Sequence, residues 1–303
     1  MTDLSRVCLA ISLFRNDETV LRLIERLTHG GVRYARILVV DSLGTGTFLS
    51  ELARRGLGDG VEYHCATQNL GSAGNLALRL ELAARTSARY VFAINHDGDA
   101  KPESIAKLAD IADGLGPELG ALYPLRRMTN RQGAFDVTGR YRFPFTAIRS
   151  KRRPKARLGP VFWGTSNGAL YSLSAPRRGL LPYADLWMCY EDLAYGWLLR
   201  QSGYSQFTAN DVELEDGYEY TRVGRLWVTD KPPWYAYYYA RNLPVAARRT
   251  QQPLPVRCLV LARVLLELGA TVAFRKQKAA RVAATLHGLK DSFFDKMGKW
   301  QLP

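Results

Sequence analysis

Polar side chains interrupt an apolar run in the stretch FAINHDGDAKP, residues 92–102. Asn95, Asp97 and Asp99 alternate along it, and carboxylate and amide oxygens are ligands that Mg²⁺ and Mn²⁺ prefer. Because Mg²⁺ keeps few protein ligands and favours substrate phosphates, a cation held here would bind a diphosphate group. An Asp-Gly turn with a local side-chain hydrogen bond explains the same residues equally well. The stretch is therefore either a cation site or a polar turn.

A second candidate is the glycine-rich stretch NLGSAGN, residues 69–75, which leads into a helical pattern. Gly71 and Gly74 would let the backbone approach a flat or charged ligand closely. Their spacing differs from GxGxxG, so the dinucleotide-binding fingerprint is not met and a dehydrogenase is disfavoured. A glycine-rich turn that caps a helix is the plain alternative.

Two further stretches carry charged side chains next to aromatic residues. Glu191 and Asp192 are adjacent at the start of a helical pattern, and neighbouring carboxylates raise each other's pKa, which suits a general base. The alternative is that both acids only complement the helix dipole, a contribution of about 0.3–1 kcal/mol. Arg241 ends the aromatic run YYYAR and could reach a phosphate or a carboxylate, whereas a half-buried aromatic helix face accounts for the same run.

The first hundred residues supply the elements that position these candidates. Apolar runs predict strands at 7–13, 37–40, 62–66 and 90–94, and helical spacing predicts helices at 17–28, 47–55 and 73–84. This alternation predicts an α/β fold with a mostly parallel central sheet and flanking helices. Ligands bind beyond the carboxyl ends of such strands. Asp41 and residues 95–99 follow two of the strands, so we expect them at one edge of the sheet.

The composition limits the partners and the compartment. Forty-two Lys and Arg against 28 Asp and Glu give a formal charge of +14, which favours an anionic partner: a nucleotide, a nucleic acid or an acidic membrane surface. Nucleic acid is disfavoured because the chain has no RNP motif, zinc spacing or basic heptad helix. Four cysteines without CxxC spacing, and a start that does not resemble a signal peptide, favour the cytoplasm. The basic run at 147–157 is either a solvated loop or a mobile loop that meets phosphates.

In their order along the chain, these motifs resemble the inverting glycosyltransferases of family 2, which have the GT-A fold. The likeness is strongest to the rhamnosyltransferase and galactofuranosyltransferase branch and covers nearly the whole chain. The residues that carry it are ILVVDS (37–42), QNLGSAGN (68–75), INHDGDAKP (94–102), WGTSNGALYS (163–172), YEDLAYGWLLRQSGY (190–204) and YYARN (238–242).

The resemblance implies sugar transfer, with inversion, from a UDP- or dTDP-sugar to a hydroxyl group. The acceptor would be a glycan or a polyprenyl-diphosphate-linked sugar in bacterial cell-surface polysaccharide synthesis, and the cofactor a divalent cation, Mg²⁺ or Mn²⁺. Asp192 would be the base and Glu191 would place the sugar or the acceptor, while Asp97 would bind the metal with Asp99 beside it. Trp163 and Gly164 would border the acceptor. The nucleotide sugar would be contacted by Asp41, Asn69, Gly71, Asn75, Asn95 and Arg241.

The resemblance also divides the chain. Residues 1–245 would form the GT-A domain, and residues 246–303 a basic amphipathic helical region. We expect this region to attach the protein to the inner face of the cell membrane, and helices that face the core with a solvated basic side are the alternative.

Two departures from the family pattern concern the metal. Asn95 stands where the family has the first acid of its DxD motif, and the stretch VELED (212–216) lacks the His that often completes the metal site. Glu213 or Asp216 would have to replace that His. A non-catalytic relative that only binds sugar nucleotides is therefore an alternative.

Overall fold

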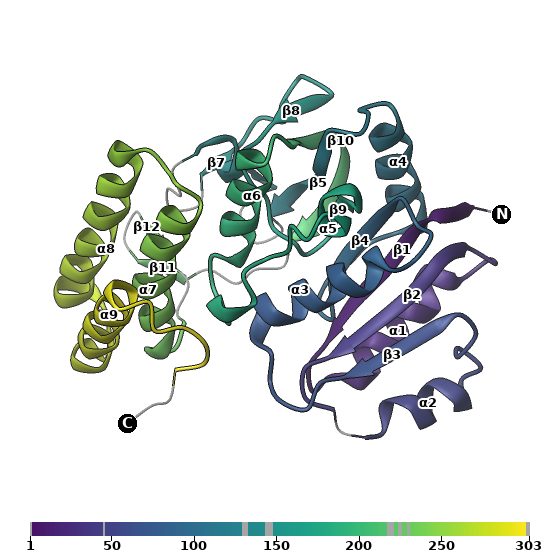
Figure 1. Ribbon diagram of the computed structural model, residues 1–303, viewed down its shortest axis with the longest axis horizontal. Helices are drawn as coiled ribbons and strands as arrows, with labels where there is room; N and C mark the ends of the chain where they lie inside the picture. Colours follow the sequence, from purple (N-terminus) through teal and green to yellow (C-terminus); the bar gives the residue numbers. More distant parts are fainter. Residues whose placement is uncertain are drawn as a thin grey trace.

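The N-terminal part of the chain alternates strands and helices, as predicted. The computed structural model describes residues 2–44, 46–128, 133–142, 148–216, 221–223, 226–228 and 231–300. The first elements are β1 (Asp3–Leu13), α1 (Asp17–Thr28), β2 (Arg33–Asp41), α2 (Phe48–Arg54), β3 (Val61–Cys65), α3 (Gly71–Ala84) and β4 (Tyr90–Asn95). Strand β1 pairs in parallel with β2 and β4, and β2 pairs in parallel with β3 (Figure 1).

The second part of the chain extends the same sheet. Its elements are α4 (Pro102–Asp113), β5 (Leu119–Met128), β6 (Phe135–Asp136), η1 (Thr138–Arg140), β7 (Arg149–Ser150), β8 (Leu158–Pro160), β9 (Ala169–Ser172), α5 (Ser174–Arg177), η2 (Ala184–Leu186), α6 (Glu191–Gln201) and β10 (Ser205–Asp216). The strand order is β3-β2-β1-β4-β9-β5-β10-β8. Strand β9 is antiparallel to both of its neighbours, whereas β5 and β10 are parallel. The sheet is therefore mostly, but not wholly, parallel.

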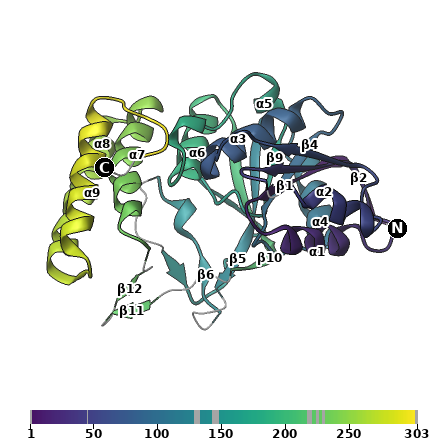
Figure 2. The same ribbon diagram turned by 90° about the horizontal axis from the view of Figure 1, so that it is seen from below.

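Side chains of β1 alternate between two apolar layers, one on each face of the sheet. Leu9, Ile11 and Leu13 pack with buried residues of α1 and α4. Cys8 and Ala10 pack on the opposite face with buried residues of α3. Figure 2 shows α1 and α4 on one side of the sheet and α3 on the other. Because successive side chains point to opposite faces, a strand buried on both faces requires the continuous apolar run that the sequence has at 7–13.

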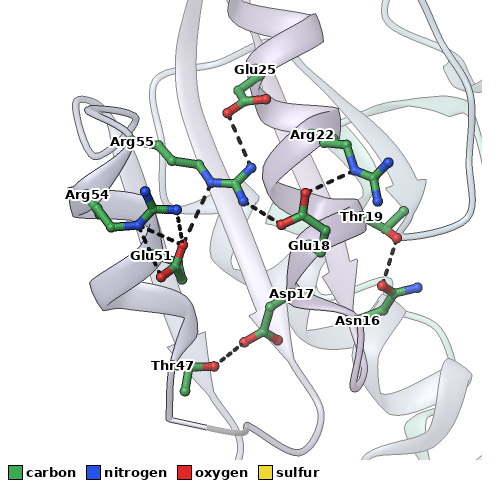
Figure 3. A network of polar contacts seen from close by, with 10 residues as sticks. All are labelled: Asn16, Asp17, Glu18, Thr19, Arg22, Glu25, Thr47, Glu51, Arg54 and Arg55. Carbon is green, nitrogen blue, oxygen red and sulfur yellow. Dashed lines mark hydrogen bonds and ion pairs between the residues drawn. The ribbon is translucent and has the colours of Figure 1, made fainter.

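A polar network joins α2 to α1 at the surface (Figure 3). The guanidinium of Arg55 contacts Glu18 and lies 3.4 Å from Glu25, and the Thr47 hydroxyl donates to Asp17 at 2.8 Å. Exposed ion pairs contribute only about 0–1 kcal/mol each. The network therefore orients α2, whereas the buried contacts stabilise it.

Three helices form the end of the molecule away from the N-terminal strands (Figure 1). They are α7 (Trp234–Arg249), α8 (Leu254–Phe274) and α9 (Lys278–Phe293), and a small pair of strands, β11 (Thr221–Val223) and β12 (Leu226–Val228), precedes them. Residue 245 lies inside α7, so a division of the chain there stays a prediction. Among the described residues, no helix is long and apolar enough to cross a bilayer.

Candidate functional site

One cavity of about 880 Å³ adjoins the carboxyl ends of β1 and β4. Its volume falls within the range of about 300–1,000 Å³ that is usual for small-molecule sites. The predicted site residues that line it are Asn69, Gly71, Asn75, Asn95, Asp97, Asp99, Trp163, Glu191 and Asp192. Residues of α7, α8 and α9 line it as well, so the structure brings three distant sequence motifs and the C-terminal helices to one place.

The glycine-rich motif packs against the loop that precedes α6. Gly71 has a φ of +64°, and a Cβ atom there would lie 2.1 Å from the carbonyl oxygen of Trp187. The Gly71 amide donates to the Asn69 side chain at 2.9 Å, and the Trp187 indole donates to the Asn69 carbonyl at 3.2 Å. Asn75 is buried and donates to the carbonyl of Val40 at 2.9 Å. Gly71 is thus required for this close approach, while the motif also lines the cavity.

The acidic stretch forms a turn at the end of β4. The Gly98 amide donates to the Asn95 carbonyl at 2.9 Å, which is the hydrogen bond of a polar turn, the alternative to a cation site. The Asn167 side chain holds this turn, because its Oδ1 accepts from the Asn95 backbone amide at 3.0 Å and its Nδ2 donates to Asp97 at 3.4 Å. Asp99 forms an ion pair with Arg26 at 3.0 Å. The stretch is therefore a fixed turn that also presents carboxylates to the cavity.

Arg79 is a cavity residue that the sequence analysis missed. It lies on α3 with 2% of its surface exposed, and its Nη1 donates to the carbonyls of Ala10 at 3.1 Å and Ile94 at 3.0 Å. Its Nη2 donates to the Asn95 side-chain oxygen at 3.2 Å. Burial lowers the pKa of Arg79 to about 10, so the group stays cationic at neutral pH. A lone arginine inside an apolar helical pattern was the available signal.

Glu191 and Asp192 form the first turn of α6, and both are partly buried. Burial, and then the charge of Asp192, raise the pKa of Glu191 to about 7. Burial also raises the pKa of Asp192, against the opposing effects of Ser166, Arg126 and Arg79. The Oδ1 atom of Asp192 is buried with no hydrogen-bond partner in the described part of the chain. A carboxylate with a raised pKa and an unpaired oxygen in a cavity can accept a proton from a bound ligand.

The loop before this pair has a left-handed backbone at three residues that are not glycine. Trp187, Cys189 and Tyr190 have φ values of +61°, +68° and +63°. The Asn242 side chain of α7 holds this loop by donating to the carbonyls of Leu186 at 3.0 Å, Cys189 at 2.9 Å and Met188. Such a backbone costs about 1–3 kcal/mol per residue and persists only where surrounding contacts fix it.

Arg241 lies away from the cavity lining. Its guanidinium is fully buried and donates to the carbonyls of Leu186 and Gly298, both at 2.7 Å. It therefore ties the loop before α6 and the C-terminal segment to α7. The same contacts occupy the nitrogen atoms that were expected to reach the nucleotide sugar.

Asp41 and Gly164 are also absent from the lining of the main cavity. Asp41 ends β2 with 1% of its surface exposed, and its carboxylate accepts from the Tyr63 hydroxyl at 2.8 Å and the Leu43 amide at 2.9 Å. Gly164 lines a smaller adjoining pocket of about 70 Å³, which Trp163 shares. The nucleoside contact of Asp41 and the acceptor contact of Gly164 stay predictions.

The stretch VELED belongs to β10, and residues of the basic run contact the same strand. Glu213 lies 3.6 Å from both Arg127 and Arg153, and the Asp216 side chain lies outside the described residues. In the basic run, Arg153 donates to the Asn210 carbonyl at 3.0 Å and Arg157 pairs with Asp211 at 3.1 Å. Ala147 is outside the described residues. These two arginines are thus attached to the sheet edge.

The fit of a divalent cation depends mainly on Asp97. No group of three His, Cys, Asp or Glu side chains that could hold a metal occurs in the described ranges. Asn95 already accepts from Arg79 and from the Ser12 hydroxyl at 3.2 Å, and Asp99 pairs with Arg26. Mg²⁺ commonly binds through one or two carboxylates together with substrate phosphates. The residues fit a cation that a bound diphosphate would complete, with Asp97 as the protein ligand.

Comparison with known proteins identifies the fold. No family model and no curated protein sequence matches the chain. Among solved structures, residues 1–349 of S. aureus TarS align with 95% of this chain and 80% of their own, at 11% identity and a TM-score of 0.61. The mannosyltransferase PcManGT of Pyrobaculum calidifontis, in complex with GDP-Man and Mn²⁺, aligns with 96% of this chain and 88% of its own, at 14% identity and a TM-score of 0.57. GalNAc-T7, solved with UDP, GalNAc and Mn²⁺, aligns with 81% of this chain and 51% of its own, at 12% identity and a TM-score of 0.56. At such identities the likeness shows the fold, and the fold is the GT-A fold that the sequence predicts.

Proposed function

We propose that the protein transfers a sugar from a nucleotide-diphosphate donor to a hydroxyl group of an acceptor, with inversion at the anomeric carbon. One observation carries the proposal: a single cavity is lined both by the turn at the end of β4 and by a carboxylate pair whose pKa values are raised. The first feature suits a diphosphate and the second suits removal of a proton.

The solved structures with this fold support a nucleotide-sugar donor. TarS has been crystallised with UDP-GlcNAc, and PcManGT with GDP-Man and Mn²⁺. For this chain the motif pattern favours a UDP- or dTDP-sugar. The same pattern favours a glycan or polyprenyl-diphosphate-linked acceptor, and a cytoplasmic role in bacterial cell-surface polysaccharide synthesis.

Asp192 is the proposed general base. Its carboxylate accepts the proton of the acceptor hydroxyl as that oxygen forms a bond to the anomeric carbon. The bond between the anomeric carbon and the diphosphate oxygen breaks, and its electron pair leaves with the diphosphate. Inversion requires that the attacking oxygen and the diphosphate lie on opposite sides of the sugar. Glu191, the neighbouring carboxylate, holds the sugar or the acceptor in place.

The leaving diphosphate gains negative charge, and the cavity has positive groups that can stabilise it. Arg79 and Arg126 both line the cavity. Asp97 would hold a divalent cation, which would supply further positive charge for the leaving diphosphate. Both arginines also oppose the rise in the pKa of Asp192, which helps keep the base ionised at neutral pH.

A panel of nucleotide sugars tests the proposal. Each donor is added with and without Mn²⁺, its effect on the melting temperature is measured, and release of the nucleoside diphosphate is followed by chromatography. We expect at least one UDP- or dTDP-sugar to raise the melting temperature and to be slowly hydrolysed. Stabilisation without hydrolysis or transfer would favour the non-catalytic alternative, and no stabilisation by any donor would overturn the proposal.

A further inference from the structure

Exposed apolar side chains gather on the C-terminal helices. Ten of the twelve large apolar side chains that the described residues expose lie between residues 254 and 294. Seven of them belong to α8: Leu254, Leu259, Leu261, Leu265, Leu266, Val272 and Phe274. We call these seven side chains the α8 apolar face. So many exposed large apolar side chains on one helix are uncommon on a soluble protein unless they belong to a contact site.

The opposite side of α8 faces the protein. Val260, Val264 and Thr271 are its buried residues, and the two charged side chains in the middle of the helix, Arg263 and Glu267, line the cavity. Glu267 is also 46% exposed and lies 3.5 Å from Arg275, so this charge is paired. Neither Arg263 nor Glu267 interrupts the pair Leu265 and Leu266, which are absent from the cavity lining.

The segment that contains this apolar face is rich in positive charge. Residues 246–303 contain eleven Lys or Arg and three Asp or Glu. Lys276 and Lys278 are exposed and lie two and four residues after Phe274, whose side chain is 77% exposed. Leucine and phenylalanine flanked by lysine are typical of helices that lie in the headgroup region of an anionic bilayer. A second copy of the chain is the other candidate occupant, but it would bring the same positive charges together.

We propose that the α8 apolar face docks on the surface of a membrane that contains anionic lipids, with α8 parallel to the bilayer plane. Figures 1 and 2 show α7, α8 and α9 together at one end of the molecule, where a flat surface can reach them. Because no described helix can span a bilayer, the contact is peripheral. If the function proposed above holds, a bilayer at α8 lies beside one wall of the cavity, which suits an acceptor that carries a lipid anchor.

Flotation of the full-length protein with vesicles tests the docking. One set of vesicles contains phosphatidylcholine alone, and the other contains phosphatidylcholine with about a third phosphatidylglycerol. The double variant Leu265→Ser/Leu266→Ser removes two side chains that are 60% and 75% exposed, and Leu49→Ser on α2 is the matched control at 53%. Lys276→Glu/Lys278→Glu tests the charge, with Arg178→Glu, another exposed position, as its control.

We expect the wild type to float with the anionic vesicles and to stay in the bottom fraction with the neutral ones. The bound fraction should fall at least fivefold in both double variants and stay unchanged in both controls. Equal flotation with both kinds of vesicle, or none at low salt, overturns the proposal. A dimer in light scattering that the Leu265/Leu266 variant abolishes would instead assign the face to a second copy.

An assay of donor hydrolysis distinguishes failure of the membrane contact from failure of the proposed enzymatic function. The two leucines point away from the cavity, so the Leu265→Ser/Leu266→Ser variant should hydrolyse a soluble donor at the wild-type rate. Lost flotation with normal hydrolysis supports the lipid contact alone, whereas normal flotation of a protein without hydrolysis would leave the contact in place and remove the enzymatic function.

Discussion

The side-chain amide of Asn242 on α7 donates a hydrogen bond to the carbonyl of Cys189, with 2.9 Å between nitrogen and oxygen. Cys189 lies two residues before Glu191, in the left-handed loop that leads into α6. A residue of the C-terminal helices thus fixes the backbone from which the proposed base projects. The position of Asp192 is therefore a property of the packed C-terminal helices as well as of the sheet.

Replacing Asn242 should loosen this loop. Asn242→Ala leaves the carbonyls of Met188 and Cys189 without the Asn242 donor, at about 1–3 kcal/mol for each buried group left unpaired, whereas the Leu186 carbonyl keeps its hydrogen bond from Arg241. We expect a lower free energy of unfolding in urea and a larger loss in kcat than in donor affinity. Asn210→Ala, which removes an equally buried asparagine of β10, is the control. Asn210→Ala should lower the free energy of unfolding without a larger loss in kcat than in donor affinity. If both variants lost more kcat than donor affinity to the same extent, the role of Asn242 would be contradicted.

Asp192→Asn should bind the donor almost normally and transfer poorly. Loss of a general base lowers turnover by about 10²–10⁴-fold. Donor affinity by calorimetry and transfer by product chromatography check this expectation. Asp185→Asn is the matched control, because Asp185 pairs with Arg249 at the surface. Turnover within threefold of the wild type for Asp192→Asn would remove this residue from the mechanism.

Glu191 should make the stability depend on pH. Its pKa is raised from 4.5 to about 7, so the folded state keeps a proton that the unfolded state has already lost. Stability from this group is fully present below about pH 4.5 and is lost as the pH rises to about 7, by on the order of 1–3 kcal/mol. Urea unfolding at pH 5 and pH 8 should show a smaller decrease for Glu191→Gln than for the wild type. An unchanged pH dependence in the variant would show that Glu191 does not titrate in this range.

The same substitution should move the pH profile of transfer. Glu191→Gln removes a negative charge beside Asp192, so the proposed base ionises at lower pH and the ascending limb of the kcat profile shifts downward. Arg79 and Arg126 remain and favour the same direction. A shift to higher pH would be incompatible with a coupled carboxylate pair.

Gly71→Ala should be far more disruptive than an ordinary glycine substitution. The new methyl group would lie 2.1 Å from the Trp187 carbonyl oxygen, at a residue with a φ of +64°. Strain of this kind costs about 1–3 kcal/mol or displaces the loop. Thermal unfolding compares it with Gly58→Ala, where nothing lies within 4 Å and φ is not positive. Equal melting temperatures for the two variants would mean that the close approach to Trp187 is absent.

Stimulation of donor hydrolysis by Mn²⁺ should depend on the Asp97 carboxylate, and a new carboxylate at residue 95 should change it little. Asp97→Asn should abolish any stimulation of donor hydrolysis by Mn²⁺, because it removes the carboxylate that fits the cation best. Asn95→Asp places the new carboxylate at the Arg79 guanidinium, which lies 3.2 Å from the Asn95 oxygen and would neutralise it. The Mn²⁺ concentration for half-maximal rate should therefore change less than threefold. A tenfold decrease of this Mn²⁺ concentration in Asn95→Asp would show that Arg79 does not contact residue 95 in solution.

Local sequence patterns predicted the N-terminal half of the fold well. The apolar runs at 7–13 and 90–94 became β1 and β4, because a strand buried on both faces needs apolar residues throughout. The spacing at 17–28 became α1, because a helix with one buried face repeats its apolar residues with the helical period. The pattern did not predict α4, β5 or β10. Strand β10 has the polar sequence SQFTANDVELED, and it is a strand because it pairs in parallel with β5 and antiparallel with β8. Pairing with distant residues overrides such weak local preferences.

In the candidate site too, local sequence patterns predicted some features and only the tertiary structure decided others. The sequence by itself placed Asn95–Asp99 after a buried strand and the two acids at the start of α6, because these depend on where one element ends. Only the tertiary structure decided that Arg241 is buried against backbone carbonyls, that Arg79 is the cation beside Asn95, and that α8 turns its leucines outward. These outcomes depend on which residues from distant parts of the chain meet when the helices pack. An arginine or an apolar helix face has the same sequence pattern whether it contacts a ligand, the core or a surface.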